Sequence, residues 1–134
     1  MIHLPSIDTG KGFISVIDNG RDHIPFPVKR VFYLYDIPGG ESRGAHAHRH
    51  CHQFIVAACG AFEVLLDDGR VQRLTQLNRS HIGLHVPPGI WISEVNFSSG
   101  SICLTLTSHD YDEDEYIRDY AGFRKWKDSK TDRP

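Results

Sequence analysis

The sequence contains neither a long hydrophobic run nor an excess of charge of one sign. Its longest apolar runs, residues 54–59 and 102–106, fall far short of the roughly 20 residues that a membrane-spanning helix needs. Lysine and arginine number 15 against 17 aspartate and glutamate, which gives a formal net charge of −2 with histidine neutral. This balance argues against a protein that coats nucleic acid or binds an anionic membrane.

Cysteine is scarce as well. Cys51, Cys59 and Cys103 are odd in number and lack closely paired spacing, so we expect reduced thiols and no disulfide scaffold. The first five residues show no basic stretch leading into a long apolar run, and we therefore expect no secretory signal. These absences predict a cytoplasmic protein without a nucleic-acid or membrane partner.

Short apolar segments separated by turn sequences make up most of the 134 residues. They predict strands at residues 13–17, 28–35, 46–58, 61–66, 71–74, 81–86, 91–97 and 101–107. Strands at such short, regular spacing are typical of an all-β sandwich or barrel. The length suits one domain, residues 1–134.

The tail follows a different pattern. Acidic residues at 112–115 suit the start of a helix, and Tyr116, Tyr120 and Phe123 then fall on one helical face. We expect a short C-terminal helix over residues 111–126, with this aromatic stripe packed on the barrel.

Histidine is unusually frequent for a chain of 134 residues. Of nine histidines, four stand at period two: His46, His48, His50 and His52. On one strand, side chains at this spacing point to the same face, toward either a cavity or solvent. A solvated polar face is the alternative interpretation for such a row.

The spacing of residues 40–60 helps to choose between these two interpretations of the histidine row. Gly40, His46, His48, Gln53 and Gly60 reproduce the first motif of the cupins, which are jelly-roll β-barrels, with glutamine in place of the usual glutamate. The chain thus resembles a single cupin-type jelly-roll barrel.

The second cupin motif falls on residues 87–96, where Ile92 stands in place of the third histidine ligand. Two histidines and a neutral amide hold zinc or iron poorly, because catalytic sites usually have three good protein ligands. His50 and His52 are possible substitutes. We predict a site without a metal or cofactor, in which neutral imidazoles transfer protons.

The block Arg-Gly-Ala-His-Ala-His at residues 43–48 extends the resemblance to the sugar 3,4-ketoisomerases of the WxcM-like cupin family. The similarity covers nearly the whole chain and includes residues 24–33, 65–69, 86–91, 97–99 and 110–118. It implies an enzyme that isomerises a dTDP-linked 4-keto-6-deoxyglucose to the 3-keto sugar without a metal. It also implies a homodimer that exchanges N-terminal strands, here near residues 14–17, and products that feed 3-amino-3,6-dideoxy sugars of surface polysaccharides.

The resemblance assigns catalytic roles. His46 and His48 match the paired active-site histidines, Arg43 matches the arginine of the motif, and Tyr33 matches a strand tyrosine. Moving a ketone from C4 to C3 requires a base for the C3 proton and donors at the oxygens. We expect His46 to be the base, with His48 and Tyr33 as proton donors or relays.

Further residues are candidates for substrate binding. Besides Arg43, they are Arg30, Gln53, Lys11 and Trp91. Each has a structural alternative: a surface ion pair or dimer contact for Arg30, a backbone contact for Gln53, and core or interface packing for Trp91. Lys11 is included because an active-site arginine or aromatic residue of the family aligns near it.

The sequence leaves three other functions open. They are a metal-dependent small cupin enzyme, a non-catalytic sugar-nucleotide-binding cupin, and a 3,5-epimerase of a similar sugar. The family has a polar, basic residue after the barrel tryptophan, where this chain has Ile92, which favours the non-catalytic alternative. The block at residues 43–48 argues against the epimerase.

Overall fold

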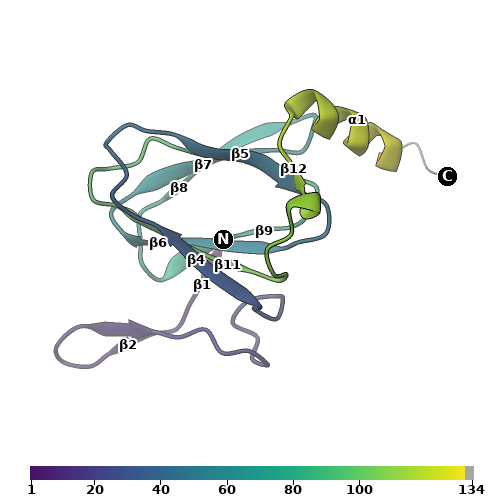
Figure 1. The fold of residues 1–134 in the computed structure, drawn as a ribbon. Coiled ribbons are helices and arrows are strands. Elements are labelled where there is room, and N and C mark those ends of the chain that lie inside the picture. The colour runs from purple at the N-terminus through teal and green to yellow at the C-terminus, as the bar shows by residue number, and fades with distance from the viewer. Residues whose placement is uncertain (132–134) are drawn as a thin grey trace.

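Two five-stranded antiparallel sheets face each other in the computed structural model, which describes residues 1–131 (Figure 1). The first sheet has the order β1 (Ile2–His3), β9 (Ile82–Val86), β6 (Gln53–Cys59), β11 (Ile102–Thr107) and β4 (Arg30–Leu34). The second has the order β12 (Tyr116–Ile117), β5 (Arg43–His48), β10 (Trp91–Val95), β7 (Phe62–Asp67) and β8 (Gln72–Leu77). The predicted jelly roll is confirmed.

The remaining elements lie outside these sheets. Strands β2 (Ser6–Asp8) and β3 (Phe13–Ser15) form a hairpin that stands away from the barrel (Figure 1). A 3-10 turn, η1 (Glu113–Glu115), leads into β12, and the helix α1 (Tyr120–Thr131) follows. A C-terminal helix was therefore predicted correctly, whereas β1 and β2 were not predicted. Residues 132–134 of the predicted domain lie outside the described residues.

The main core fills the space between the sheets. Its buried side chains alternate along the strands with outward-facing ones, as period two requires. They include Ile55 and Ala57 on β6, Val64 on β7, Ile92 on β10 and Cys103 on β11. This alternation fixes which residues face the barrel interior.

Two smaller cores cover the outer faces. On the first sheet, Phe54 and Val56 pack against Leu4, Ile24 and Phe26 of the N-terminal segment. On the second sheet, the helix covers another apolar patch, formed by Ala47, Ile117 and Phe123 with Trp91 and Trp126 beside them. No helix within residues 1–131 is long and apolar enough to cross a membrane.

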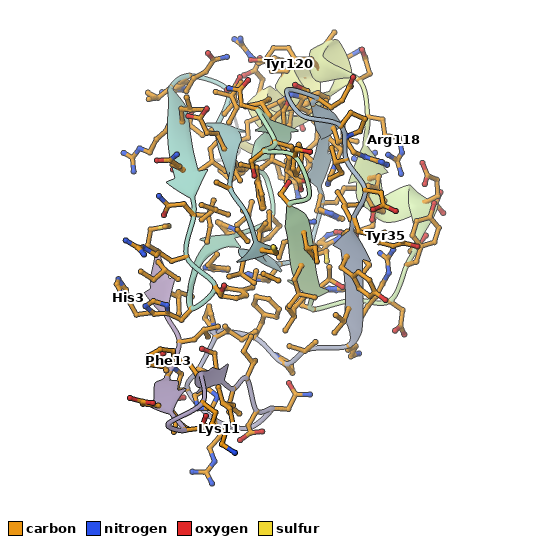
Figure 2. All side chains as sticks on the ribbon, turned by 90° about the vertical axis from the view of Figure 1, so that its left-hand side faces the viewer. His3, Lys11, Phe13, Tyr35, Arg118 and Tyr120 are labelled. Atoms are coloured by element: carbon orange, nitrogen blue, oxygen red, sulfur yellow. The ribbon has the colours of Figure 1, made fainter. Side chains whose placement is uncertain are left out.

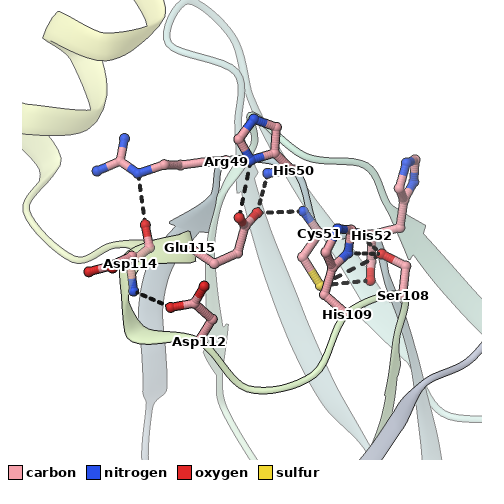
Figure 3. A network of polar contacts seen from close by, with 9 residues as sticks. All are labelled: Arg49, His50, Cys51, His52, Ser108, His109, Asp112, Asp114 and Glu115. Atoms are coloured by element: carbon pink, nitrogen blue, oxygen red, sulfur yellow. Dashed lines mark hydrogen bonds and ion pairs between the residues drawn. The ribbon is translucent and has the colours of Figure 1, made fainter.

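The predicted strand over residues 46–58 is wrong, because the chain bends at residues 49–52 between β5 and β6. The backbone there bonds to the C-terminal segment: the Arg49 N–H donates to the Glu115 carbonyl over 3.0 Å. The Cys51 N–H donates to the Glu115 carboxylate over 2.6 Å, and the His50 N–H donates to the same carboxylate (Figure 3). A segment more than 60 residues away thus satisfies the groups that a continuous strand would have paired.

The predicted helix over residues 111–126 is also only partly correct, since α1 begins at Tyr120. Asp112 caps the 3-10 turn, and its side chain accepts from the Asp114 N–H over 3.0 Å. Tyr116 and Ile117 then pair with His48 and Ala47 at the edge of β5. The tail therefore places Tyr116 on a strand beside His48, instead of on the helical stripe predicted for it.

Candidate active site

His46 and His48 face the barrel interior from β5. His46 pairs in register with Ile92 of the main core, and both imidazoles are buried, with exposed fractions of 8% and 5%. Their ring centroids lie 5.0 Å apart with the rings nearly perpendicular. Period two along one strand therefore brings two imidazoles to one side of the interior.

Both imidazoles are neutral at physiological pH. Burial lowers the pKa of His46 from 6.5 to about 4, although a hydrogen bond to the Gly44 backbone opposes the shift. Burial also lowers the pKa of His48 to about 3, with further lowering by His46 and by the cations of Arg30 and Arg118. Neutral rings of this kind can accept a proton or donate an N–H hydrogen bond.

Four buried side-chain atoms of this interior lack hydrogen-bond partners in the protein. Nε2 of His46 and both ring nitrogens of His48 have none. Gln53 faces the same interior, two residues before Ile55 on β6, and its Oε1 is likewise buried without a partner. Because buried polar groups are nearly always hydrogen-bonded, these four atoms in the barrel interior mark a place for a polar ligand.

Tyr116 completes the group from β12, the strand paired with β5 in the same sheet. Its ring centroid lies 4.4 Å from that of His48 and 5.2 Å from that of His46. Nη1 of Arg30 on β4 donates to its hydroxyl over 3.4 Å. Arg30 thereby links the edge strand of the first sheet to that of the second.

Two arginines add positive charge here. The guanidinium of Arg118 lies 4.4 Å from the Tyr116 ring, but the Glu113 carboxylate pairs with it over 2.6 and 3.0 Å. Arg30 packs over the Phe32 ring at 4.7 Å, on the same face of β4, and no carboxylate within residues 1–131 pairs with it. Arg30 therefore places a guanidinium that no carboxylate of these residues neutralises near the histidines.

Glu115 fixes the geometry of this corner. Besides the backbone of the bend, its carboxylate contacts Nδ1 of His50 at 3.2 Å (Figure 3). These bonds lower the pKa of Glu115, against a burial effect that raises it. The carboxylate ties the end of β5 to η1, and so it sets the place of Tyr116 against His48.

A β-bulge shapes the other end of β5. The register shifts between Ile92, opposite His46, and Glu94, opposite Arg43. Gly44 takes a left-handed φ of 77° at this point, which favours glycine. Arg43 is exposed and lines a hollow of about 520 Å³ with Tyr35 and Glu41.

Three predicted site residues are not brought to the histidine pair within one chain. Tyr33 is 60% exposed on the outer face of β4, because alternation turns Arg30 and Phe32 inward. Trp91 packs outside the second sheet, edge-on to Tyr120 at 5.3 Å between centroids. Lys11 lies with the hairpin, at the end of the molecule away from Arg118 (Figure 2).

The histidine row of four is likewise not one face. His50 is exposed at the bend. His52 does not join His46 and His48. Its ring stacks on that of His85, and Nδ1 of His52 lies 2.9 Å from Nε2 of His85. The bend at residues 49–52 ends the period-two pattern after His48. Among the described residues, no three His, Cys, Asp or Glu side chains converge as metal ligands.

Sequence reasoning missed two interior residues. The helical pattern predicts that Tyr116 packs as part of the helix, although residues 110–118 also belong to the family resemblance. Glu94 lies two positions after Ile92 and so faces the same interior, where it is only 5% exposed. Its period-two relation to Ile92 was the signal that could have found it.

Over residues 1–128 the chain matches the family described as WxcM-like, C-terminal. It is 37% identical over 126 residues to the TDP-4-oxo-6-deoxy-alpha-D-glucose-3,4-oxoisomerase of Aneurinibacillus thermoaerophilus, which covers 94% of this chain and 90% of that protein. A 3,4-ketoisomerase from Helicobacter canadensis is similar in structure, with a TM-score of 0.91, 36% identity and 95% of each chain covered.

A sugar 3,4-ketoisomerase from Thermoanaerobacterium thermosaccharolyticum, solved in complex with TDP, is similar with a TM-score of 0.92 at 29% identity. That match covers 96% of this chain and 93% of the other. A histidine-to-asparagine variant of the same protein was solved in complex with TDP-4-keto-6-deoxyglucose. The similarity thus spans nearly the full length of each protein.

Proposed function

The chain belongs to the WxcM-like, C-terminal family, and we propose that it is a sugar-nucleotide 3,4-ketoisomerase. It converts dTDP-4-keto-6-deoxyglucose to the corresponding dTDP-3-keto-6-deoxyhexose, for the synthesis of 3-amino-3,6-dideoxy sugars of surface polysaccharides. The observation that carries this proposal is the pair of buried, neutral imidazoles whose free nitrogens meet in the barrel interior.

His46 is the base in this proposal. Its hydrogen bond to the Gly44 backbone leaves Nε2 as the free nitrogen. The C3 proton of the substrate is acidic because the C4 carbonyl takes up the developing negative charge. Nε2 removes that proton to form the enediol. The proton on the imidazolium exchanges with solvent, and Nε2 then protonates C4, so that the carbonyl moves to C3.

The oxygens of the sugar need donors while this charge develops. A neutral His48 offers one N–H, and Tyr116 offers a hydroxyl held by Arg30. Preorganised donors of this kind stabilise an enolate more than they stabilise the ketone. Tyr116 takes the role first expected of Tyr33, because its ring contacts both histidines.

Positive charge suits the diphosphate of the substrate. Arg30 and Arg43 both have guanidinium groups outside any ion pair of the described residues. The fork of a guanidinium binds phosphate oxygens in pairs. The Gln53 amide, with its free Oε1, is placed for a sugar hydroxyl.

A homodimer with exchanged N-terminal strands accounts for the hairpin. Ile7, Phe13 and Ile14 are exposed by 53%, 73% and 51%, which is costly for apolar side chains in an isolated hairpin. Pairing with a second copy covers them and the sheet edge together. In such a dimer Lys11 acts on the partner's site, and the enzyme works in the cytoplasm without a cofactor.

The decisive test is proton NMR of the purified protein with dTDP-4-keto-6-deoxyglucose in D₂O. The proposal expects a dTDP-3-keto product that carries deuterium at C4. An unchanged spectrum, with the C3 proton retained, would contradict the isomerase and leave the non-catalytic sugar-nucleotide-binding alternative. Turnover that requires added metal would favour the metal-dependent cupin.

A further inference from the structure

Glu94 is a buried carboxyl that the mechanism above does not use. It extends from β10 into the barrel interior, and its exposed fraction is 5%. The only other buried acid within residues 1–131 is Asp67, which accepts hydrogen bonds from the Tyr120 hydroxyl over 2.6 Å and from the Gly69 N–H over 2.7 Å. Glu94 receives one weak bond, from the Cys103 thiol at 3.7 Å.

The carboxyl lies beside the proposed base. A β-carbon placed on Gly44 would be 3.8 Å from Cε1 of His46 and 3.9 Å from Oε1 of Glu94. The two side chains therefore flank one glycine on neighbouring strands, and both are buried in the barrel interior. An apolar side chain would pack better at this position, since a buried carboxyl with one weak partner is destabilising.

The surroundings keep this carboxyl able to exchange a proton. Burial raises the pKa of Glu94 to about 7, while the Cys103 hydrogen bond and the Arg43 cation oppose the shift. Burial and Glu94 itself raise the pKa of the Cys103 thiol, so the thiol stays protonated. From β7, the residue paired with Glu94 is the apolar Val64, and from β5 the facing groups are Arg43 and His46.

The isomerisation needs a second proton transfer besides the one between the carbons. The substrate has a hydroxyl at C3 and a carbonyl at C4, and the product has the reverse, so a proton must also pass from O3 to O4. We propose, on the basis of the function proposed above, that the Glu94 carboxyl is the catalytic group that carries this proton from O3 to O4.

The two transfers balance. As His46 takes the C3 proton, the carboxylic acid of Glu94 gives its proton to O4, and the C3–H electron pair becomes the C3–C4 double bond of the enediol. The Glu94 carboxylate then takes the proton of the O3 hydroxyl, the carbonyl forms at C3, and His46 protonates C4. Both side chains return to their starting states, and no oxidant or reductant is consumed.

The variant Glu94→Gln tests this role, because the amide keeps the size and can donate to an oxygen but cannot pass a proton on. We expect isomerisation to fall by at least about 100-fold. Exchange of the C3 proton with D₂O, which needs only His46 and a donor at O4, is expected to fall far less. Isomerisation within about threefold of the unaltered protein, or an equal loss of both rates, would overturn the proposal.

Asp67→Asn is the matched control, since it makes the same change at a buried carboxyl that faces α1. We expect it to keep the ratio of isomerisation to C3 exchange, even where it lowers the melting temperature. If the unaltered protein neither isomerises nor exchanges, the proposed function fails. An active protein whose Glu94→Gln variant is equally active rejects only the role of Glu94.

The unaltered protein allows a second, independent test of the role of Glu94, which remains valid even if the variant does not fold. The first step needs the protonated acid, so kcat is expected to fall as the pH rises through about 7. An infrared band of a protonated carboxyl should disappear over the same range. A kcat that is constant between about pH 6 and about pH 9 would contradict the proposal.

Discussion

Replacement of His46 by asparagine separates the chemistry of the proposed site from its architecture. The asparagine amide can occupy the place of the imidazole Nδ1 and keep the hydrogen bond to the Gly44 backbone. It has no counterpart of Nε2, the nitrogen that is buried without a partner. The substitution should therefore remove the base while the bulge and the binding residues stay in place.

The size of the effect follows from the state of the ring. With a pKa of about 4, His46 is almost entirely neutral at pH 7, so the unaltered enzyme has its base fully available. A positioned general base contributes about 10²–10⁴-fold, which corresponds to about 3–5 kcal/mol of activation free energy. We expect His46→Asn to lose that factor in kcat, with the Kd for dTDP changed by less than about threefold.

The assay is single-turnover NMR for the chemical step, together with calorimetric titration of dTDP. His50→Asn is the matched control, because the structure places His50 at the exposed bend with 70% of its side chain accessible. It should retain activity within about threefold, since the backbone bonds to Glu115 remain. If His50→Asn loses as much as His46→Asn, the assignment of the pair is refuted.

Three other predictions test the site and the assembly. The pKa of His46 is 6.5 in the unfolded chain and about 4 in the folded protein. The contribution of His46 to the free energy of unfolding is therefore complete above about pH 6.5 and falls by about 3 kcal/mol toward pH 4. Urea unfolding should show that the free energy of unfolding decreases less with falling pH in His46→Asn than in the unaltered protein. Turnover should survive exhaustive chelation with EDTA; loss of activity that zinc or iron restores would contradict the metal-free site. Sedimentation at micromolar concentration should show a dimer, and a 15.2 kDa species alone would exclude strand exchange.

Much of the site could be predicted from the residues. The spacing from Gly40 to Gly60 placed His46 and His48 together, and the block at 43–48 pointed to the family that the comparisons support. Alternation along a strand also places Arg30 and Phe32 on one face, where the guanidinium packs over the Phe32 ring. These inferences hold because they depend on neighbours along one strand, whose geometry is local.

Local pattern could not decide which face of a strand is interior. Period two separates Tyr33 from Phe32 but does not say which of them meets the core, and the structure turns Phe32 inward. The same limit hid Glu94, whose role depends on the partner strand beside it. In the sequence alone, a polar residue of the barrel interior cannot be distinguished from a polar residue of the surface, because only the packing of the two sheets defines the interior.

The sequence by itself determined a jelly roll, a C-terminal helix and a pair of histidines at period two. Only the tertiary structure decided where the strand that carries this pair ends and which side chains contact the two imidazoles. The Glu115 carboxylate binds the N–H groups of His50 and Cys51, residues more than 60 positions away, and so breaks the strand after His48. The same tail then adds a strand at the edge of β5 and brings Tyr116 onto both imidazoles. Backbone hydrogen bonds between distant segments require the folded chain, because no local periodicity records which remote carboxylate will satisfy a bend.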